Sequence, residues 1–287
     1  NPGDEVIIPA PYWVSYPAMT QLAQGIPVPV RTSFEHNYRL TPEQLEEAIT
    51  DKTRVLILCS PSNPTGSCYS KQDLEGLAEV LRRYPNISII SDEIYEYIVF
   101  DEEHISLLNV APDLKDRVAL INGFSKGFAM TGWRLGYLAG PEELVKAVGK
   151  IQSQETSAPS SISQAAGFAA YSGTLDEVLV MRASFKTRRD FMVEQLNSIE
   201  GVSCFSPGGA FYVFPDIFSY LGSVTPSGTP IESSTDLCLY LLDEVGLALV
   251  PGDAFGEPDG LRMSYAAAMD DLVEAMNRFK HGLAGLS

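Results

Sequence analysis

Three short apolar runs, each closed by polar residues, constrain the fold of this chain more than any other feature. The runs are Val55–Cys59, Ile87–Ser91 and Val118–Ile121. They have the length of strands buried on both faces, and helix-length segments separate them, which is typical of a parallel sheet covered by helices. We therefore predict an α/β fold. In such sheets ligands bind beyond the carboxyl ends of the strands.

The residues that follow these runs are the candidates for chemistry. Asn63 follows the first run, Asp92 and Tyr95 the second, and Lys126 the third, with Arg134 further along the same connection. A partly desolvated lysine near other cations has a lowered pKa, and its neutral amine can form a Schiff base with a carbonyl. A lone lysine on a loop is more often only solvated, so the prediction depends on its neighbours.

Downstream of these runs the sequence pattern changes. The region 141–198 is helical, ending in a long amphipathic stretch. Shorter elements follow it, and they predict a second α/β unit: strands at Val202–Phe205, Ala210–Phe214, Leu247–Val250 and Leu261–Ser264, and helices at Ser234–Glu244 and Asp270–Leu283. We therefore divide the chain into a large domain, residues 1–185, and a small domain, residues 186–287.

Composition excludes several classes of function. With 37 acidic and 20 basic residues the net charge is −17, which opposes binding to nucleic acid and to anionic membranes. The four cysteines and three histidines lack the spacing of a metal site or a disulfide framework. No apolar run reaches the length of a membrane span. The chain opens on Asn1 rather than methionine, so a segment with a targeting signal can precede it.

Three motifs carry a resemblance to a known family. They are Ser-Pro-Ser-Asn-Pro-Thr-Gly at 60–66, Ser-Asp-Glu-Ile-Tyr at 91–95, and Ser-Lys-Gly-Phe-Ala-Met-Thr-Gly-Trp-Arg at 125–134. With them the whole chain resembles the fold-type-I pyridoxal-phosphate aminotransferases of class I/II. Within that family it is most similar to the plant and algal bifunctional aspartate and glutamate/aspartate-prephenate aminotransferases, and nearly as similar to bacterial aspartate aminotransferases of the same branch.

The resemblance implies a cofactor, substrates and an assembly. The cofactor is pyridoxal 5′-phosphate, and the reaction transfers an amino group from aspartate or glutamate to a 2-oxo acid such as 2-oxoglutarate, oxaloacetate or prephenate. The family assembles as homodimers, in which each site borrows groups from its neighbour. A plastid location follows if the likeness to the plant and algal enzymes holds.

The resemblance also implies roles for residues at the strand ends. Lys126 binds the cofactor covalently and then moves the substrate's Cα proton. Asp92 pairs with the pyridinium nitrogen, although a carboxylate at this position is otherwise a common helix N-cap. Tyr95 and the Asn63 amide donate to the cofactor's O3′. Without the resemblance, each residue has a simpler interpretation: Tyr95 as a half-buried aromatic, and Asn63 as an Asx-turn residue before Pro64.

Three further residues complete the implied site. Arg134 binds the phosphate, and Trp13 stacks on the pyridine ring and lies beside the substrate. Considered without the resemblance, Arg134 is more simply a surface charge and Trp13 a core aromatic. Arg262 lies between apolar residues on a predicted strand, where a guanidinium needs an anion. The family supplies the substrate α-carboxylate, and a structural salt bridge is the alternative. Phe211 is placed either in the substrate pocket or in the core.

Two departures from the family pattern bear on these expectations. Gly123 stands where the family often has a phosphate-binding hydroxyl, and that role is not transferred to Ser125. The family's first segment, with its Gly-rich phosphate turn, has no counterpart in the chain, so a protein that truly begins at Asn1 is expected to bind the cofactor weakly. Two alternatives stay open: a lyase of the same fold, and the ligand-sensing half of a transcription regulator.

Overall fold

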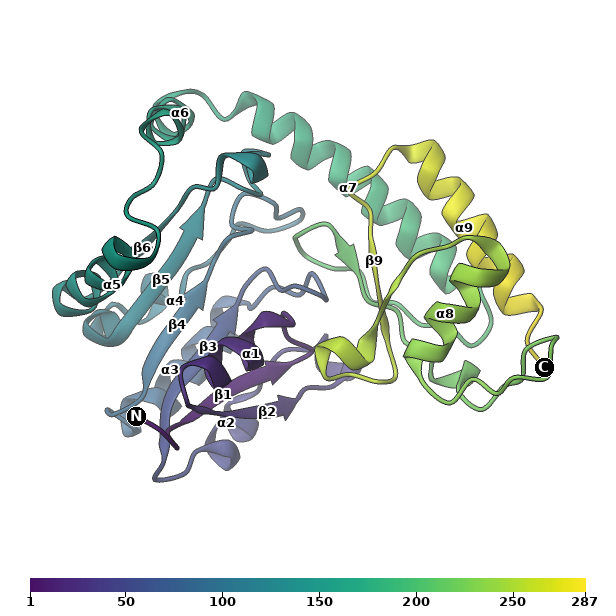
Figure 1. The fold of residues 1–287 in the computed structure, drawn as a ribbon, viewed down its shortest axis with the longest axis horizontal. Helices are drawn as coiled ribbons and strands as arrows, with labels where there is room; N and C mark the ends of the chain where they lie inside the picture. Colours follow the sequence, from purple (N-terminus) through teal and green to yellow (C-terminus); the bar gives the residue numbers. More distant parts are fainter.

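The computed structural model describes residues 1–287 and contains two sheets (Figure 1). The first has six strands in the order β2-β1-β3-β4-β5-β6. All its neighbours pair in parallel except β6, which runs antiparallel to β5. The α/β prediction is therefore confirmed. The strands are β1 (Glu5–Ala10), β2 (Ile26–Arg31), β3 (Thr53–Cys59), β4 (Ser88–Asp92), β5 (Val118–Gly123) and β6 (Gly136–Ala139).

Helices pack on both faces of this sheet because the strand residues alternate between the faces. On one face, Ile7, Leu56 and Ile89 pack in a core with α2 (Pro42–Ala48), α3 (Lys71–Arg83) and α4 (Leu107–Val110). On the other, Ile8 and Ile57 pack against Tyr16 of α1 (Ser15–Leu22). Thr41 is the N-cap of α2, because its side chain and that of Gln44 form a capping box at the start of the helix.

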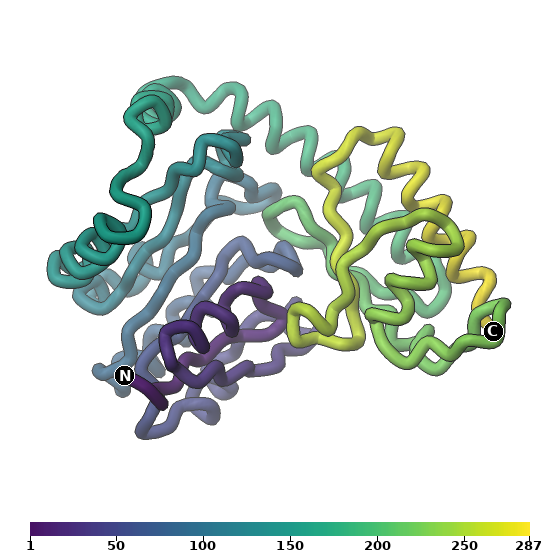
Figure 2. Tube along the Cα trace, viewed as in Figure 1, coloured from purple at the N-terminus to yellow at the C-terminus, as the bar shows by residue number.

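Three helices then lead away from the sheet: α5 (Glu142–Glu155), α6 (Ser161–Ser172) and α7 (Asp176–Asn197). No side chain of α5 is buried. Figures 1 and 2 show α7 extending from the first sheet to the second part of the chain. The predicted division at residue 185 falls inside this unbroken helix and stays a prediction.

The second sheet is small, antiparallel and ordered β7-β9-β8. Its strands are β7 (Tyr212–Val213), β8 (Val250–Pro251) and β9 (Leu261–Ser264). The helices α8 (Ser234–Val245) and α9 (Met269–Ala284) pack with it and with α7 around Tyr265 and Phe279. The predicted strand at Val202–Phe205 is wrong: Ser203 makes one isolated bridge to Asp216, and β7 pairs with β9 instead.

Short 3₁₀ turns connect several of these elements: η1 (Phe34–His36), η2 (Pro112–Arg117), η3 (Thr131–Trp133), η4 (Phe218–Tyr220) and η5 (Gly252–Phe255). The two chain ends lie at opposite ends of the molecule (Figure 2). Among its helices, none combines the length and the apolar character needed to cross a membrane.

Candidate active site

The strand register brings the polar loops of the first sheet together. Cys59 of β3 pairs with Asp92 of β4, and Asp92 pairs in turn with Ile121 of β5. Because the three strands are parallel and in register at this point, the segments that follow them leave the sheet side by side. Asn63, Asp92 and Lys126 therefore reach one edge of the sheet although they are far apart in the sequence.

A cavity of about 280 Å³ lies at this edge. The predicted cofactor residues line it together: Trp13, Asn63, Asp92, Tyr95, Lys126 and Arg134. Trp13 is 37% exposed, so it lies at the mouth of the cavity rather than in the core. Its ring meets that of Tyr16 edge-on, with the two centroids 5.4 Å apart.

Asp92 is held at the end of β4 by two hydrogen bonds. The Tyr16 hydroxyl donates to its Oδ2 at 2.6 Å, and the Ile94 backbone N–H donates to its Oδ1 at 3.2 Å. Burial raises the pKa of Asp92, and the Tyr16 hydrogen bond partly offsets this by stabilising the charged form. Sequence reasoning missed Tyr16. The signal was its closeness in sequence to Trp13, because the Tyr16 backbone N–H donates to the Trp13 carbonyl at the turn into α1.

Lys126 is half-buried between aromatic rings. Its Nζ lies 5.7 Å from the ring centroid of Tyr95 and 5.6 Å from that of Phe211. Burial lowers the pKa of Lys126, and the charges of Arg262 and Arg134 lower it further, while Asp92 raises it. The amine is therefore poised to lose its proton more readily than an ordinary lysine, as a nucleophile or base requires.

Arg134 is exposed and follows the turn η3 in a left-handed backbone conformation with φ 51°. Its Nη1 donates to the Thr131 carbonyl at 2.9 Å, which leaves its remaining N–H donors free to bind an anion. The close pairing of β5 and β6 explains why Gly123 stands where the family often has a phosphate-binding hydroxyl. A Cβ there would lie 2.8 Å from Gly136 Cα and 2.9 Å from the Leu135 carbonyl oxygen, so β5 and β6 pair too closely for any side chain.

The second sheet contributes Arg262 from β9. Its Nη1 donates to Asn63 Oδ1 at 2.9 Å, which joins the two parts of the site. The guanidinium lies over two rings, with its Cζ 4.6 Å from the Tyr212 centroid and 5.0 Å from the Phe255 centroid. Its Nε is buried without a hydrogen-bond partner. A buried cationic donor left unpaired is costly, so this position favours an anionic ligand.

Tyr95 is buried, and its hydroxyl lies 3.0 Å from that of Tyr212. If Tyr212 donates, the Tyr95 hydroxyl remains free to donate into the cavity. Phe211 packs beside Tyr95, with centroids 5.5 Å apart. Sequence reasoning missed Tyr212, and the only signal was its place in the aromatic run that follows Gly208 and Gly209. The site thus takes aromatic side chains from both sheets.

The donors around this cavity fit pyridoxal 5′-phosphate. The cofactor presents an aldehyde, a pyridine nitrogen, a phenolic oxygen and a phosphate. The cavity offers an amine at Lys126, a carboxylate at Asp92, a hydroxyl at Tyr95 and a guanidinium at Arg134. The amide nitrogen of Asn63 also stays available, because Arg262 bonds to the amide oxygen.

A second group of titratable side chains lies near this edge. Glu93, Glu96 and His104 place one ligand-type atom each within 4.8 Å of one another. Glu93 already accepts hydrogen bonds from Ser91 and Ser106, and His104 Nε2 lies 2.8 Å from its Oε2. These contacts describe a hydrogen-bonded network, and the expectation of no metal site stays a prediction.

Comparison with known proteins agrees with this geometry. The sequence profile described as "Aminotransferase class I and II" matches residues 1–278. The chain is 51% identical to a bifunctional aspartate aminotransferase and glutamate/aspartate-prephenate aminotransferase of Petunia hybrida, over 99% of this chain and 60% of the relative. It is 49% identical to an aspartate/prephenate aminotransferase of Cereibacter sphaeroides, over 100% of this chain and 72% of the relative.

A solved structure shows the same architecture. The crystal structure of the aspartate aminotransferase from Rhizobium meliloti superposes with a TM-score of 0.97 at 47% identity, covering 100% of this chain and 72% of the other. The chain therefore spans 60% to 72% of the length of these relatives. Profile, relatives and fold agree, and the chain belongs to the class I and II aminotransferases.

Proposed function

We propose that this protein transfers an amino group, with pyridoxal 5′-phosphate, from aspartate or glutamate to a 2-oxo acid. The observation that supports it most is the position of Lys126, a half-buried amine whose pKa is lowered by burial and by Arg262 and Arg134. The relatives named aspartate/prephenate aminotransferase support the choice of substrates. Oxaloacetate, 2-oxoglutarate and prephenate are the proposed acceptors.

The cofactor, when bound, supplies an electrophilic carbon and a ring that withdraws electrons from the substrate's Cα. Lys126 holds it covalently and serves as the base that takes the Cα proton and returns it. Asp92, fixed by Tyr16, keeps a proton on the ring nitrogen. Tyr95 and Asn63 donate to the phenolic oxygen, Arg134 binds the phosphate, and Trp13 stacks on the ring.

Arg262 binds the substrate α-carboxylate in this proposal. Its unpartnered Nε and its contact with Asn63 place a guanidinium edge beside the cofactor residues. A carboxylate binds such an edge through two parallel hydrogen bonds, which fixes the orientation of the substrate. Asn63 then bonds to both Arg262 and the cofactor and couples substrate binding to the reaction centre.

The test is a panel of amino donors offered to the chain loaded with pyridoxal 5′-phosphate. Aspartate and glutamate should convert the cofactor to its amino form, and 2-oxoglutarate, oxaloacetate or prephenate should restore it, as followed by absorbance. Alanine, kynurenine and branched-chain donors are the comparison set. Reaction with these donors alone would refute the proposed substrate class, and no reaction with any donor would refute transamination.

We further propose that the protein works as a homodimer. Helices α5 and α6 lie at the end of the molecule far from the second sheet (Figure 1) and carry apolar side chains in solvent. Ile162 is 73% exposed and Phe168 75% exposed, which is unusual for side chains of this size. A second copy covering this face would bury them. Sedimentation should show a dimer that Phe168→Glu weakens, and a wild-type monomer at micromolar concentration would contradict the proposal.

A further inference from the structure

One buried carboxylate, Glu93, has no part in the function proposed above. It is only 3% exposed and follows Asp92 directly at the end of β4. Successive side chains of a strand point to opposite faces, so Ser91 and Asp92 of β4 lie on either side of the sheet. Asp92 meets Tyr16 on the α1 side. Glu93 shares its face with Ser91, whose hydroxyl donates to Glu93 Oε1 at 2.8 Å.

Glu93 is held in its charged form. The Ser106 hydroxyl donates to Oε1 at 2.7 Å, and His104 Nε2 lies 2.8 Å from Oε2. Burial opposes ionisation, but the hydrogen bonds from His104, Ser106 and Ser91 outweigh it and hold the pKa of Glu93 below its ordinary value. Three bonds to one buried carboxylate are more than packing alone requires, and they keep a negative charge beside the site.

That charge acts on Asp92. Burial raises the pKa of Asp92, and the negative charge of Glu93 raises it further, against the Tyr16 hydrogen bond and the charge of Lys126. A carboxylate that holds its own proton more strongly also attracts a protonated partner more strongly, because both effects follow from the local negative potential. The partner of Asp92 in the proposed function is the protonated ring nitrogen of the cofactor.

We propose that Glu93 is a positioning residue that acts through Asp92: from the opposite face of the sheet, its buried charge strengthens the hold of Asp92 on a protonated ring nitrogen. The inference rests on the proposed function. Glu93 does not touch the cavity that contains Lys126. Its contribution is the electrostatic potential at Asp92.

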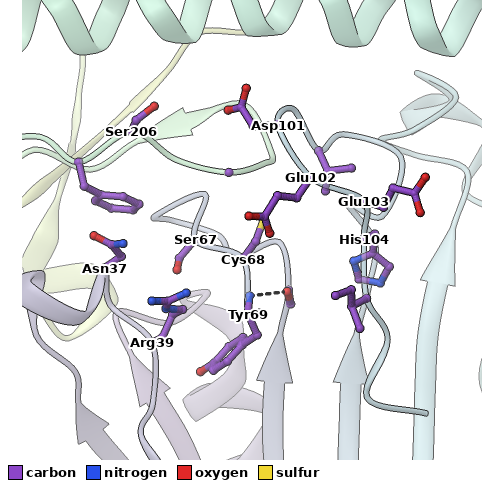
Figure 3. Close-up of a pocket in the computed structure, with 15 residues that line it drawn as sticks. Asn37, Arg39, Ser67, Cys68, Tyr69, Asp101, Glu102, Glu103, His104 and Ser206 are labelled. Atoms are coloured by element: carbon purple, nitrogen blue, oxygen red, sulfur yellow. Dashed lines mark hydrogen bonds between the residues drawn. The ribbon is translucent and has the colours of Figure 1, made fainter. Parts of the chain in front are cut away.

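His104 contributes a hydrogen bond to the Glu93 network. Figure 3 shows its ring at one side of a second cavity of about 190 Å³, with Glu102 and Glu103 on the same loop. Glu96 also lies near Glu93 and His104. Substituting His104 changes one hydrogen bond and leaves the Glu93 carboxylate in place, so it separates the effect of the hydrogen bond from the effect of the charge.

The experiment measures the pKa of Asp92 by carbon-13 NMR of the side-chain carboxyl in the chain without cofactor. Glu93→Gln keeps the shape and removes a negative charge, so the pKa of Asp92 should fall. His104→Gln keeps a donor to Glu93 and leaves its carboxylate in place, so it should change the pKa of Asp92 far less than Glu93→Gln does. Ser91→Ala removes one hydrogen bond and no charge, and it should leave this pKa unchanged. A role in folding alone would not single out the charge of Glu93, and an unchanged pKa in Glu93→Gln would overturn the inference.

A second measurement connects this effect to the cofactor. Titration with pyridoxal 5′-phosphate should show affinity several-fold weaker in Glu93→Gln than in wild type, because Asp92 then holds a protonated ring nitrogen less strongly. If wild type does not bind the cofactor, the proposed function fails while the pKa comparison still tests Glu93. If Glu93→Gln does not fold, Asp92→Asn replaces it. The electrostatic coupling between the two carboxylates is reciprocal, so the pKa of Glu93 should fall in Asp92→Asn. An unchanged pKa of Glu93 would overturn the inference.

Discussion

The two sheets supply different parts of the site. The first sheet gives Lys126, Asp92 and Asn63 from neighbouring parallel strands, and their loops are fixed by one register. The second gives Arg262 from a short antiparallel strand, and it reaches the cavity through one hydrogen bond to Asn63. Asp92 is satisfied within the chain by Tyr16 and Ile94, whereas Arg262 Nε still lacks an acceptor.

This difference suggests a division between the sheets, with the first suited to bind the cofactor and the second the substrate. Groups fixed by parallel strand ends suit a cofactor that stays bound through every turnover, because preorganised groups need not rearrange. A single cation that lacks an acceptor, provided by the other sheet, suits a substrate that binds and leaves. The free energy that this unpaired guanidinium costs in the free protein is recovered when the substrate binds. Substitutions in the first sheet should therefore damage cofactor chemistry, and those in the second should damage substrate binding.

The largest effect is expected for Lys126→Ala. In the proposed function this amine links the cofactor covalently and moves the Cα proton, so its loss should lower transamination about 10³-fold, within the range for a positioned proton-transfer group. Single-turnover absorbance measures it, with Lys115→Ala on the exposed turn η2 as the control. Borohydride reduction and peptide mapping of wild type should place the pyridoxyl group on Lys126, and a label on another lysine would refute the assignment.

The second substitution tests the other sheet. Arg262→Lys keeps the charge but loses the flat two-donor edge, and hydrogen bonds to charged groups contribute about 1.5–3 kcal/mol each. The KM for aspartate should rise roughly 10–100-fold while the affinity for pyridoxal 5′-phosphate stays unchanged. Arg278→Lys, exposed on α9, is the matched control. An equal loss of cofactor affinity would remove the proposed division between the sheets.

The same division explains what the sequence could predict. Apolar runs with polar ends specify a parallel sheet, and a parallel sheet brings Asn63, Asp92 and Lys126 to one edge whatever the details of packing. The contact between Asn63 and Arg262 depends on how two separate sheets meet, which no local pattern contains. For Arg262, the residues alone indicated that a guanidinium between apolar neighbours needs an anion, and only the family resemblance pointed to the substrate α-carboxylate rather than a salt bridge.

The missed and wrong assignments have a related cause. In sequence, Tyr16 and Tyr212 look like core aromatics. Each contributes to the site through its hydroxyl, and the partner of that hydroxyl comes from a distant segment of the chain. Val202–Phe205 has the composition of a strand, but without a neighbouring strand to pair with, it keeps only the bridge at Ser203. Gly123 is explained only by the close approach of Gly136 across β5 and β6.

A smaller effect is expected for Tyr16→Phe. The substitution removes the 2.6 Å hydrogen bond that favours the charged form of Asp92, so the pKa of Asp92 should rise. Carbon-13 NMR of the Asp92 carboxyl in the chain without cofactor measures this pKa, with Tyr84→Phe at the end of α3 as the control. A hydrogen bond to a charged group contributes about 1.5 kcal/mol at the low end, so the effect should be smaller than that of Arg262→Lys. An unchanged pKa would show that the Ile94 N–H alone holds Asp92 in its charged form.

The smallest effect concerns the pH dependence of Lys126. Only a neutral amine attacks an aldehyde, and the pKa of Lys126 is lowered by burial, by Arg262 and by Arg134.

Pyridoxal without its phosphate is the probe, because its attachment does not require Arg134 to bind an anion. Arg134→Gln removes a positive charge and should raise the pKa of Lys126. At a fixed pH below that pKa, fewer amines are then neutral, and the attachment rate should fall about two- to fivefold. The midpoint of the pH–rate curve should move to higher pH, with Lys126→Ala giving the background rate. A wild-type midpoint equal to that of an ordinary lysine would show that the surrounding cations do not activate the amine, and Lys126 would then depend on the bound cofactor for its reactivity.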